Sequence, residues 1–351
     1  MPLGPVALVG DGGGMGHVIG VIPASGGVGA TTFAAVLAVR AAETGHPVVA
    51  VDLDSFGGRL DVVLGVEQEP GWRWEQLRGV AGVVDGGGLA RELPQSGPLH
   101  VLAGATRAAE PERSRADGHP AAAWGTVVSD VVAGLAAAHR VTVLDLARDA
   151  AVVESVAPLV DAWVVVAGTG VPQLASAAVS VPLLRRLVDG ACARASGAGR
   201  VTAAGAGLRR PCEPWLVLRG ARIEDDIADA VCDHLDVPVI ARVRDDLRLV
   251  SDVTCGVAPG ARGRGAVVEA ADEILLRLVS QPPIELAMSP RPAGSRARPP
   301  GASGPGTASA PGAASAPGTV PAPGTASGPG TASAPGVRTG ADPSERWGWS
   351  A

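Results

Sequence analysis

The sequence contains no lysine: all 29 of its cationic residues are arginine, and tyrosine is also absent. The lack of lysine excludes Schiff-base chemistry and the lysine clamp that many phosphate-binding loops use. Acidic residues number 35, so the formal net charge is −6. This balance argues against a broad basic surface for nucleic acid or for anionic lipid.

Cysteine is scarce, and long apolar runs are missing. The cysteines at 192, 212, 232 and 255 form neither a CxxC pair nor a zinc-like spacing with histidine. We interpret them as isolated thiols in a reduced compartment. The chain has no cationic start followed by an apolar segment, and no apolar run approaches about 18 residues. The sequence therefore predicts a cytoplasmic protein without an integral membrane segment.

Glycine (49 residues) and proline (30 residues) are too frequent for one compact fold. They concentrate in 281–351, where a Pro-Gly step recurs every six residues. Such a segment has too little apolar bulk to offset its ordering entropy, so we expect a disordered tail. Its last tryptophans, Trp347 and Trp349, are either a docking peptide or merely terminal residues. Before the tail we expect a Gly-rich arm over 1–17 and a folded domain over 18–280.

The folded domain alternates short apolar runs with stretches of helical periodicity. Apolar strands between helices indicate a parallel sheet that is covered on both faces. We therefore predict an α/β fold: a doubly wound, mostly parallel sheet of about seven strands. The expected strands are 18–22, 47–51, 99–102, 141–144, 161–167, 215–218 and 237–240. The expected helices are 31–44, 121–139, 173–188, 223–235 and 265–279, with surface loops over 103–119 and 189–212.

A glycine-rich segment, residues 25–32, follows the first predicted strand and opens the first predicted helix. Its glycines let the backbone turn inward, and together with the helix N-terminus they form a cradle for an anion. A P-loop has lysine at position 30, where this chain has Ala30. From these residues alone, a phosphate cradle and a turn that holds no phosphate both remain open. The predicted nucleotide-binding residues are Gly26, Gly27, Val28, Gly29, Ala30, Thr31 and Thr32.

Three acidic residues follow two of the predicted strands. Asp52 and Asp54 come at the end of the second strand, and Asp145 follows the strand over 141–144. In a parallel α/β sheet, the carboxyl ends of the strands face the crevice where ligands bind. A single aspartate in such a place is often a helix cap, but three of them beside a glycine loop favour a site. We predict that Thr31, Asp52 and Asp145 hold Mg²⁺, the acids acting through water.

These segments together resemble the MinD/ParA class of P-loop ATPases, whose deviant Walker A loop reads KGGxGK[T/S]T. Within that class the chain is similar to the CpaE-like branch and to the septum site-determining proteins of actinobacteria. The resemblance implies binding of ATP or ADP with Mg²⁺, a homodimer, and Asp54 as the residue that positions water. It also implies that the segment after the last β-α pair lies near the base. The segments that carry it are 18–38, 48–67, 99–105, 141–148, 159–168 and 235–249.

The departures from this class bear on activity. Ser25 and Ala30 stand where the class has its two lysines, and Asp145-Leu146-Ala147 replaces the usual Asp-x-Pro. Losing one partly buried charged contact weakens triphosphate binding by roughly 30–150-fold. Arg59 and Arg148 lie nearest the acids in sequence, and each is a candidate to supply part of the lost charge.

The sequence therefore favours a regulator or scaffold on a degenerate ATPase fold, with weak or no hydrolysis of ATP. Its expected partners are proteins of septum-site determination or of a Tad-type secretion or pilus machine. The alternative is an active ParA/MinD-type ATPase that cycles between monomer and nucleotide-bound dimer, and a small-molecule ligase of the same superfamily is disfavoured. The helix over 266–279 carries an acidic face, which is unlike a basic membrane anchor. Cations are not clustered enough to predict a specific nucleic-acid surface.

Overall fold

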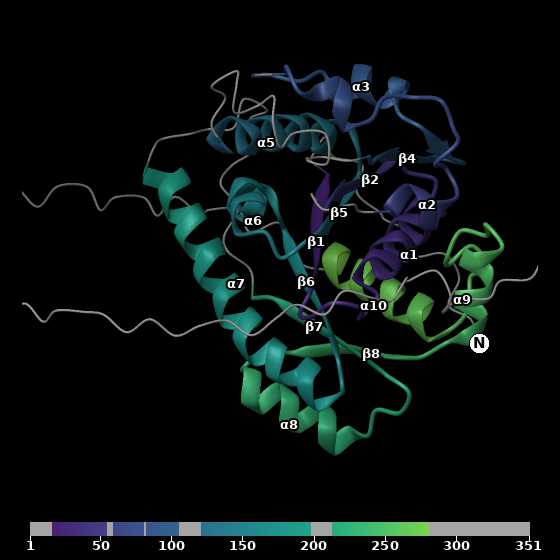
Figure 1. The fold of residues 1–351 in the computed structure, drawn as a ribbon, viewed down its shortest axis with the longest axis vertical. Coiled ribbons are helices and arrows are strands. Elements are labelled where there is room, and N and C mark those ends of the chain that lie inside the picture. The colour runs from purple at the N-terminus through teal and green to yellow at the C-terminus, as the bar shows by residue number, and fades with distance from the viewer. Residues whose placement is uncertain (1–15, 55–58, 81, 105–120, 198–212, 281–351) are drawn as a thin grey trace, which may run out of the picture. The chain divides into compact units, whose positions relative to one another are not determined.

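A computed structural model describes residues 16–54, 59–80, 82–104, 121–197 and 213–280 (Figure 1). The residues 1–15 of the predicted arm and the predicted tail over 281–351 lie outside the described residues. The boundaries of the three predicted parts therefore stay predictions.

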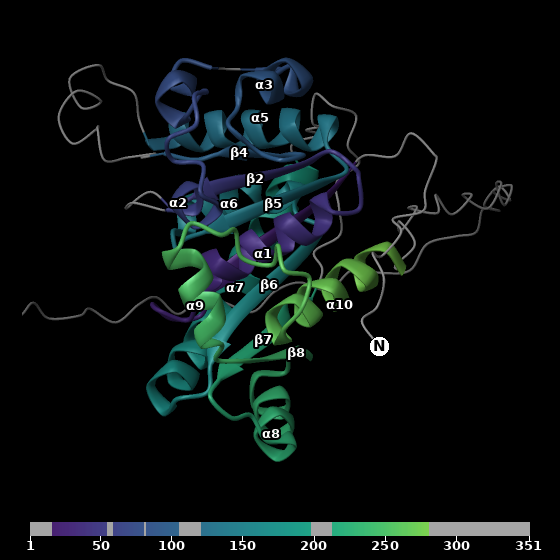
Figure 2. The same ribbon diagram turned by 90° about the vertical axis from the view of Figure 1, so that its right-hand side faces the viewer.

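The described residues form an eight-stranded sheet with the order β3-β4-β2-β5-β1-β6-β7-β8. All neighbouring strands pair in parallel except β3, a two-residue edge strand antiparallel to β4. Figure 2 shows β4, β2, β5, β6, β7 and β8 following one another from top to bottom. The strands are β1 (His17–Pro23), β2 (Val48–Leu53), β3 (Gln95–Ser96), β4 (Leu99–Leu102), β5 (Val141–Leu146), β6 (Ala162–Gly168), β7 (Trp215–Gly220) and β8 (Val239–Arg244).

Helices cover both faces of the sheet because alternate residues of each strand point to opposite faces. One buried cluster joins Ile19, Val21 and the residues of the other strands on the same face of the sheet to α1, α2 and α10. The other joins Val18, Ile22 and their equivalents to α5, α6, α7 and α8. This confirms the doubly wound α/β fold. The helices are α1 (Ala30–Ala42), α2 (Leu60–Leu64), α3 (Gly86–Glu92), α5 (Ala121–Ala138), α6 (Ala150–Val156), α7 (Val171–Gly197), α8 (Asp225–Leu235), α9 (Leu247–Thr254) and α10 (Ala266–Ser280), with 3-10 turns Trp74–Leu77 and Ala157–Leu159.

Helix α10 docks on α1 through a buried ion pair and an apolar stripe. Arg40 of α1 donates from Nε and Nη2 to the two carboxylate oxygens of Asp272, at 2.8 and 3.0 Å. Arg40 also pairs with Glu43 one turn away. Ile274 and Leu275 of α10 are buried in the cluster on this face of the sheet. The predicted acidic-faced last helix is thus part of the core.

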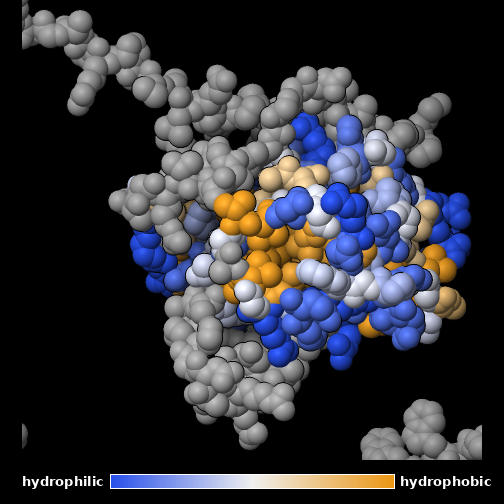
Figure 3. Space-filling model, turned by 90° about the horizontal axis from the view of Figure 1, so that it is seen from above, coloured by the Kyte–Doolittle hydropathy of each residue, from blue (hydrophilic) through white to orange (hydrophobic). Residues whose placement is uncertain are grey.

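The face above α3 and α5 carries hydrophobic residues at its centre, with hydrophilic residues around them (Figure 3). Helix α5 has a single charged residue, Asp130, in eighteen, and a helix with so few charges usually packs on several sides.

None of the helices in the described part of the chain combines the length and the apolar character that a membrane span requires.

One detail of the prediction is wrong. Residues 189–197 are not a surface loop, because α7 continues to Gly197, and its residues Ala191 and Cys192 are buried. The rest of that predicted loop, 198–212, and most of the one over 103–119 lie outside the described part of the chain. The sheet has eight strands where about seven were predicted, and the additional strand is β3, whose two residues are too few to show as an apolar run.

Candidate nucleotide site

The glycine-rich loop lies between β1 and α1, in the middle of the sheet. Strand β1 has β5 on one side and β6 on the other. The N-cap of α1 is Gly29, which provides no side-chain hydrogen bond to the first turn of the helix. The first N–H groups of α1 therefore keep their capacity to bind an anion.

Two glycines give this loop its backbone conformation. Gly27 and Gly29 have φ angles of 75° and 82°, a region that side chains other than glycine rarely adopt. A Cβ placed on Gly26 or Gly27 would meet nothing within 4 Å. The loop therefore borders open space, as a cradle for a bound group requires.

Two buried oxygen atoms at this site lack a hydrogen-bond partner. They are Ser25 Oγ and Asp145 Oδ2, in side chains that are 8% and 2% exposed. An unpaired buried polar atom is costly, and a bound ion or water is one explanation for such an atom in a native protein. A hydroxyl and a carboxylate oxygen are suitable contacts for a phosphate and for Mg²⁺, so the residues present fit both groups.

Asp145 is the centre of the predicted metal site. It pairs in register with Asp52 across β5 and β2. Burial, followed by the charge of nearby Asp52, raises the pKa of Asp145 to about 8, although a hydrogen bond with Thr31 opposes the rise. The side chains of Thr31 and Asp145 are thus in contact, and their role toward a metal stays a prediction. No group of three or more His, Cys, Asp or Glu side chains among the described residues can hold a metal on its own.

Asp52 organises the turn after β2. Its side chain is fully buried, and its oxygens accept hydrogen bonds from the backbone N–H of Asp54 (3.0 Å) and of Leu60 (3.2 Å). Burial raises its pKa to about 6, while these two bonds lower it. Asp52 therefore holds both Asp54 and the start of α2 beside the site. The metal role of Asp52 and the water-positioning role of Asp54 stay predictions.

The lysine positions of the loop contain small side chains. Ser25 and Ala30 are both buried. The two arginines that were candidates to replace the lost charge lie elsewhere. Arg148 lines a separate cavity of about 660 Å³ between α6 and α7, and Arg59 is exposed just before α2.

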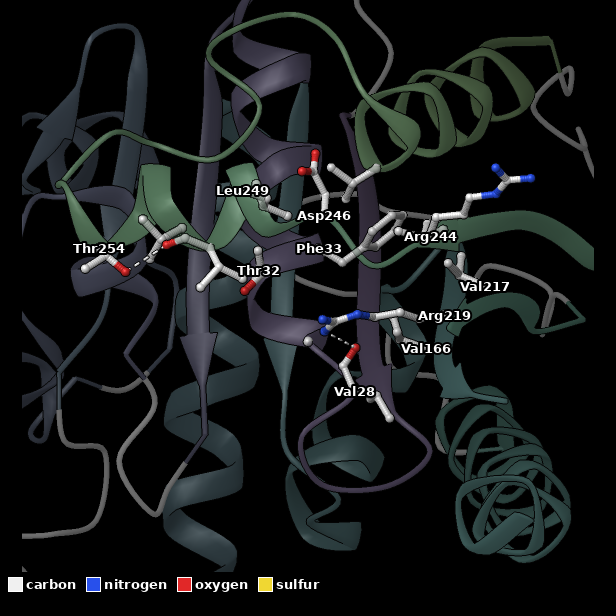
Figure 4. A pocket seen from close by; sticks show the side chains of 15 residues that line it. Val28, Thr32, Phe33, Val166, Val217, Arg219, Arg244, Asp246, Leu249 and Thr254 are labelled. Atoms are coloured by element: carbon white, nitrogen blue, oxygen red, sulfur yellow. Dashed lines mark hydrogen bonds between the residues drawn. The ribbon is translucent and has the colours of Figure 1, made fainter. Parts of the chain in front are cut away.

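An arginine that the sequence analysis did not single out reaches the loop instead. Arg219, in β7, donates from Nη1 to the carbonyl oxygen of Val28 at 3.1 Å and from Nε to Asp245 Oδ1 at 2.9 Å. Figure 4 shows its guanidinium lying against the loop, whereas the Arg244 side chain points away from it. A contact across 191 residues has no local signal in a sequence.

A cavity of about 250 Å³ opens beside this arginine. Its wall combines the loop and the first turn of α1 with the ends of β6, β7 and β8 and with α9. Thr32 lies in this wall, away from the Thr31–Asp145 contact. Part of this wall comes from the segment 235–249, which the resemblance places near the base of a nucleotide. The lining residues include Val28, Gly29, Thr32, Phe33, Arg219, Arg244, Asp246, Leu249 and Val253.

Comparison with known proteins gives a short sequence match. No protein-family model matches the chain. Uncharacterized proteins MT3760 and Rv3660c of two Mycobacterium tuberculosis strains are 37% identical to it over 100 residues. That match covers 28% of this chain, and the chain spans about a quarter (27%) of the length of these relatives.

The likeness to solved structures is broader, although the sequence identity is low. A ParA family ATPase from Chlorobium tepidum matches with a TM-score of 0.56 and 16% identity, over 75% of this chain and 99% of that one. MinD from Pyrococcus horikoshii, solved with Mg-ADP, matches with a TM-score of 0.53 and 18% identity, over 75% and 96%. The MinC:MinD complex of Aquifex aeolicus matches with a TM-score of 0.50 and 17% identity, over 76% and 97%. The chain has the fold of the MinD/ParA P-loop ATPases.

Proposed function

We propose that this protein is a regulator or scaffold on a degenerate MinD/ParA-type fold, one that binds adenine nucleotide weakly and hydrolyses it at or near background. One observation carries the proposal: the loop and the Thr31–Asp145 contact are in place, but buried Ser25 and Ala30 occupy both lysine positions. Mg²⁺, when bound with a nucleotide, would supply charge neutralisation at the outer phosphates.

The chain's own residues divide the work at this site. The loop N–H groups would bind phosphate, Thr31 and Asp145 would hold the metal, and Asp52 fixes Asp54 at the end of β2. A positive group aimed at the outer phosphates is what an active P-loop adds, and its loss costs about 10²–10³ in rate. Because no loop side chain carries that charge, binding without appreciable turnover is the expected behaviour.

The process served is the placing of a division septum or the assembly of a Tad-type secretion or pilus machine, in the cytoplasm. The resemblance to CpaE-like and septum site-determining proteins supports this, as does the MinD/ParA fold. Direct partners would be proteins of those machines, together with a second copy of the chain. MinD with this fold occurs in a complex with MinC, a cell division protein. The alternative, an active ATPase that cycles between monomer and dimer, conflicts with Ala30 and Ser25.

Calorimetry of the full chain with Mg-ATP and Mg-ADP, run beside a steady-state hydrolysis assay, tests the proposal. We expect weak binding and turnover at background. Turnover comparable to ordinary ParA-type ATPases, and abolished by Asp54→Ala, would establish the active alternative.

Restoring the loop lysine is the complementary test. If the cradle is intact, Ala30→Lys should tighten Mg-ATP binding by about 1–3 kcal/mol, the range of a charged hydrogen bond. Hydrolysis should recover far less until Ser25→Lys is added, and the double variant should make dimerisation respond to ATP. A folded Ala30→Lys protein without tighter binding would remove the nucleotide from the proposal and leave a protein-interaction scaffold.

A further inference from the structure

We propose that Arg219 supplies the positive charge of this site, and that the site therefore recognises the base and the inner phosphate of a nucleotide rather than its outer phosphates. This inference rests on the proposed binding of nucleotide at the loop and assigns its specificity. The expected ligand class is an adenine nucleotide of any phosphorylation state, with AMP bound about as well as ATP when Mg²⁺ is absent.

The first argument is contact. The guanidinium of Arg219 bonds to the carbonyl oxygen of Val28 inside the loop. Its Nη1 lies 2.3 Å from where a Cβ on Gly29 would be, so glycine at that position makes room for the arginine as well as for the turn. Among the described arginines, Arg219 alone donates a hydrogen bond to the segment over 25–32.

The second argument is that this arginine keeps donors for a ligand. Nε and Nη1 are used, and Nη2 makes no hydrogen bond within the described part of the chain. The side chain is 34% exposed, and so is open to the cavity and to solvent. Asp245 offsets part of the charge, but its own side chain is 48% exposed, and an ion pair in that setting exchanges readily with an anion. The other charged groups of the cavity wall are Arg244 and Asp246.

The third argument is position. Loop N–H groups of a P-loop cradle the inner phosphates, and the loop lysine serves the outer ones. Arg219 contacts the loop at Val28 and Gly29, and all three residues line the cavity. At position 30 the chain offers a methyl group instead of a cation. An ordinary P-loop has its positive charge beside the outer phosphates, whereas in this chain the positive charge lies on the side of the loop that faces the cavity.

Calorimetry of the full chain with AMP, ADP and ATP in excess EDTA tests this inference. We expect the three dissociation constants to agree within about fivefold. The outer phosphates of ADP and ATP would remain solvated and without a cation partner, so they should change the affinity by no more than about that factor. Arg219→Met should weaken all three by about 10–150-fold, the range for one charged hydrogen bond. Arg242→Met is the matched control: Arg242 is on the neighbouring strand β8 and pairs with Asp225 instead, so binding should not change.

Hydrogen exchange of the free protein provides a readout without ligand. In Arg219→Met, the amides of the loop should exchange faster while those of β7 stay protected, which separates loss of the loop contact from unfolding. ATP binding at least 100-fold tighter than AMP in EDTA, or equal binding by Arg219→Met and the wild type, would overturn the inference. Absence of binding by every nucleotide would also overturn it and would leave the scaffold proposal standing. ParA-like turnover would instead refute the proposed function.

Discussion

At the scale of single residues, the buried carboxyl group of Asp145 opposes folding when it is ionised. Its pKa is about 8 in the folded protein, against an ordinary value of 3.8. A raised pKa means that the folded state prefers the protonated acid. The stabilising contribution is therefore complete below about pH 4 and is lost as the pH rises to about 8. Above pH 8 the empty protein holds a buried, ionised carboxylate.

We therefore predict that Asp145→Asn raises the melting temperature of the nucleotide-free protein, and more so at pH 8.5 than at pH 5. Each kcal/mol gained should raise the Tm by about 2–4 °C in a chain of this size. Scanning calorimetry at the two pH values measures the difference. Asp229→Asn, on the exposed side of α8, is the control and should be neutral. An unchanged or lower Tm for Asp145→Asn at pH 8.5 would contradict the prediction.

A second residue-scale prediction concerns the histidine pair at the other end of the sheet. His139 is 3% exposed; its Nδ1 contacts the carbonyl oxygen of Leu135 at 2.7 Å, and its Nε2 contacts His100 Nδ1 at 3.2 Å. Burial lowers the pKa of both rings, and the neighbouring ring lowers that of His139 further. Because the unfolded chain takes up these protons first, stability falls as the pH drops below about 6.5.

The measurement is the change in Tm between pH 7.5 and pH 5. We expect His139→Gln to reduce this change relative to the wild type, whatever its effect at neutral pH. His234→Gln, on the exposed surface of α8, should leave it as it is. If the His139→Gln protein showed the full wild-type pH dependence, the pair would have no part in acid sensitivity.

The sequence predicted the residues of the loop and the acids, because each is a short pattern at the end of a strand. The structure brings Thr31 into contact with Asp145 and places Asp52 beside Asp145, while the roles of these residues toward a nucleotide stay predictions. Arg219 could not be found in this way. Its place at the loop depends on the parallel pairing of β7 with β6, which only the folded sheet establishes.

At the scale of elements, the packing of α10 on α1 depends on a charge as well as on apolar area. We predict that Arg40→Met destabilises the protein by about 3 kcal/mol, because it leaves Asp272, only 14% exposed, without its partner. Arg277→Met is the control. It breaks an exposed pair with Glu273 on the same helix and should cost less than about 1 kcal/mol.

Urea unfolding of the two variants gives the comparison. A loss of similar size in both would mean that the Arg40–Asp272 pair adds nothing beyond surface electrostatics. The double variant Arg40→Met with Asp272→Leu should recover much of the loss, since an apolar pair of similar volume avoids the desolvation cost of the ions.

The long elements were predictable and the short ones were not. The parallel strands were located within a few residues, because each is a run of buried apolar side chains between turns. The short helices α2, α3, α6 and α9 have five to eight residues, too few to show a helical period of their own. Side-chain hydrogen bonds stabilise the starts of three of them: Asp52 of β2 accepts the Leu60 N–H at the start of α2, and the N-cap residues Asp149 and Asp246 cap α6 and α9.

At the scale of the whole molecule, the two buried clusters lie between Val18 and Leu278 in the described part of the chain. Each cluster contains apolar side chains from the strands and from the helices on one face. The composition of 281–351 offers few side chains able to extend a core. Stability should therefore reside in the described part of the chain.

The final prediction follows from this division. Truncation after Ser280 should leave the Tm within about 4 °C of the full chain, because no more than about 1 kcal/mol is expected from a polar, glycine-rich segment. Truncation after Gly265 is the contrasting control. It removes α10 with Val268, Ile274 and Leu275, each worth about 1.5–3 kcal/mol of burial, and the sum approaches the whole stability of an ordinary domain. Scanning calorimetry should show a normal transition for the first protein and none for the second. A large fall in Tm after the first truncation would show that the residues beyond 280 pack on the domain.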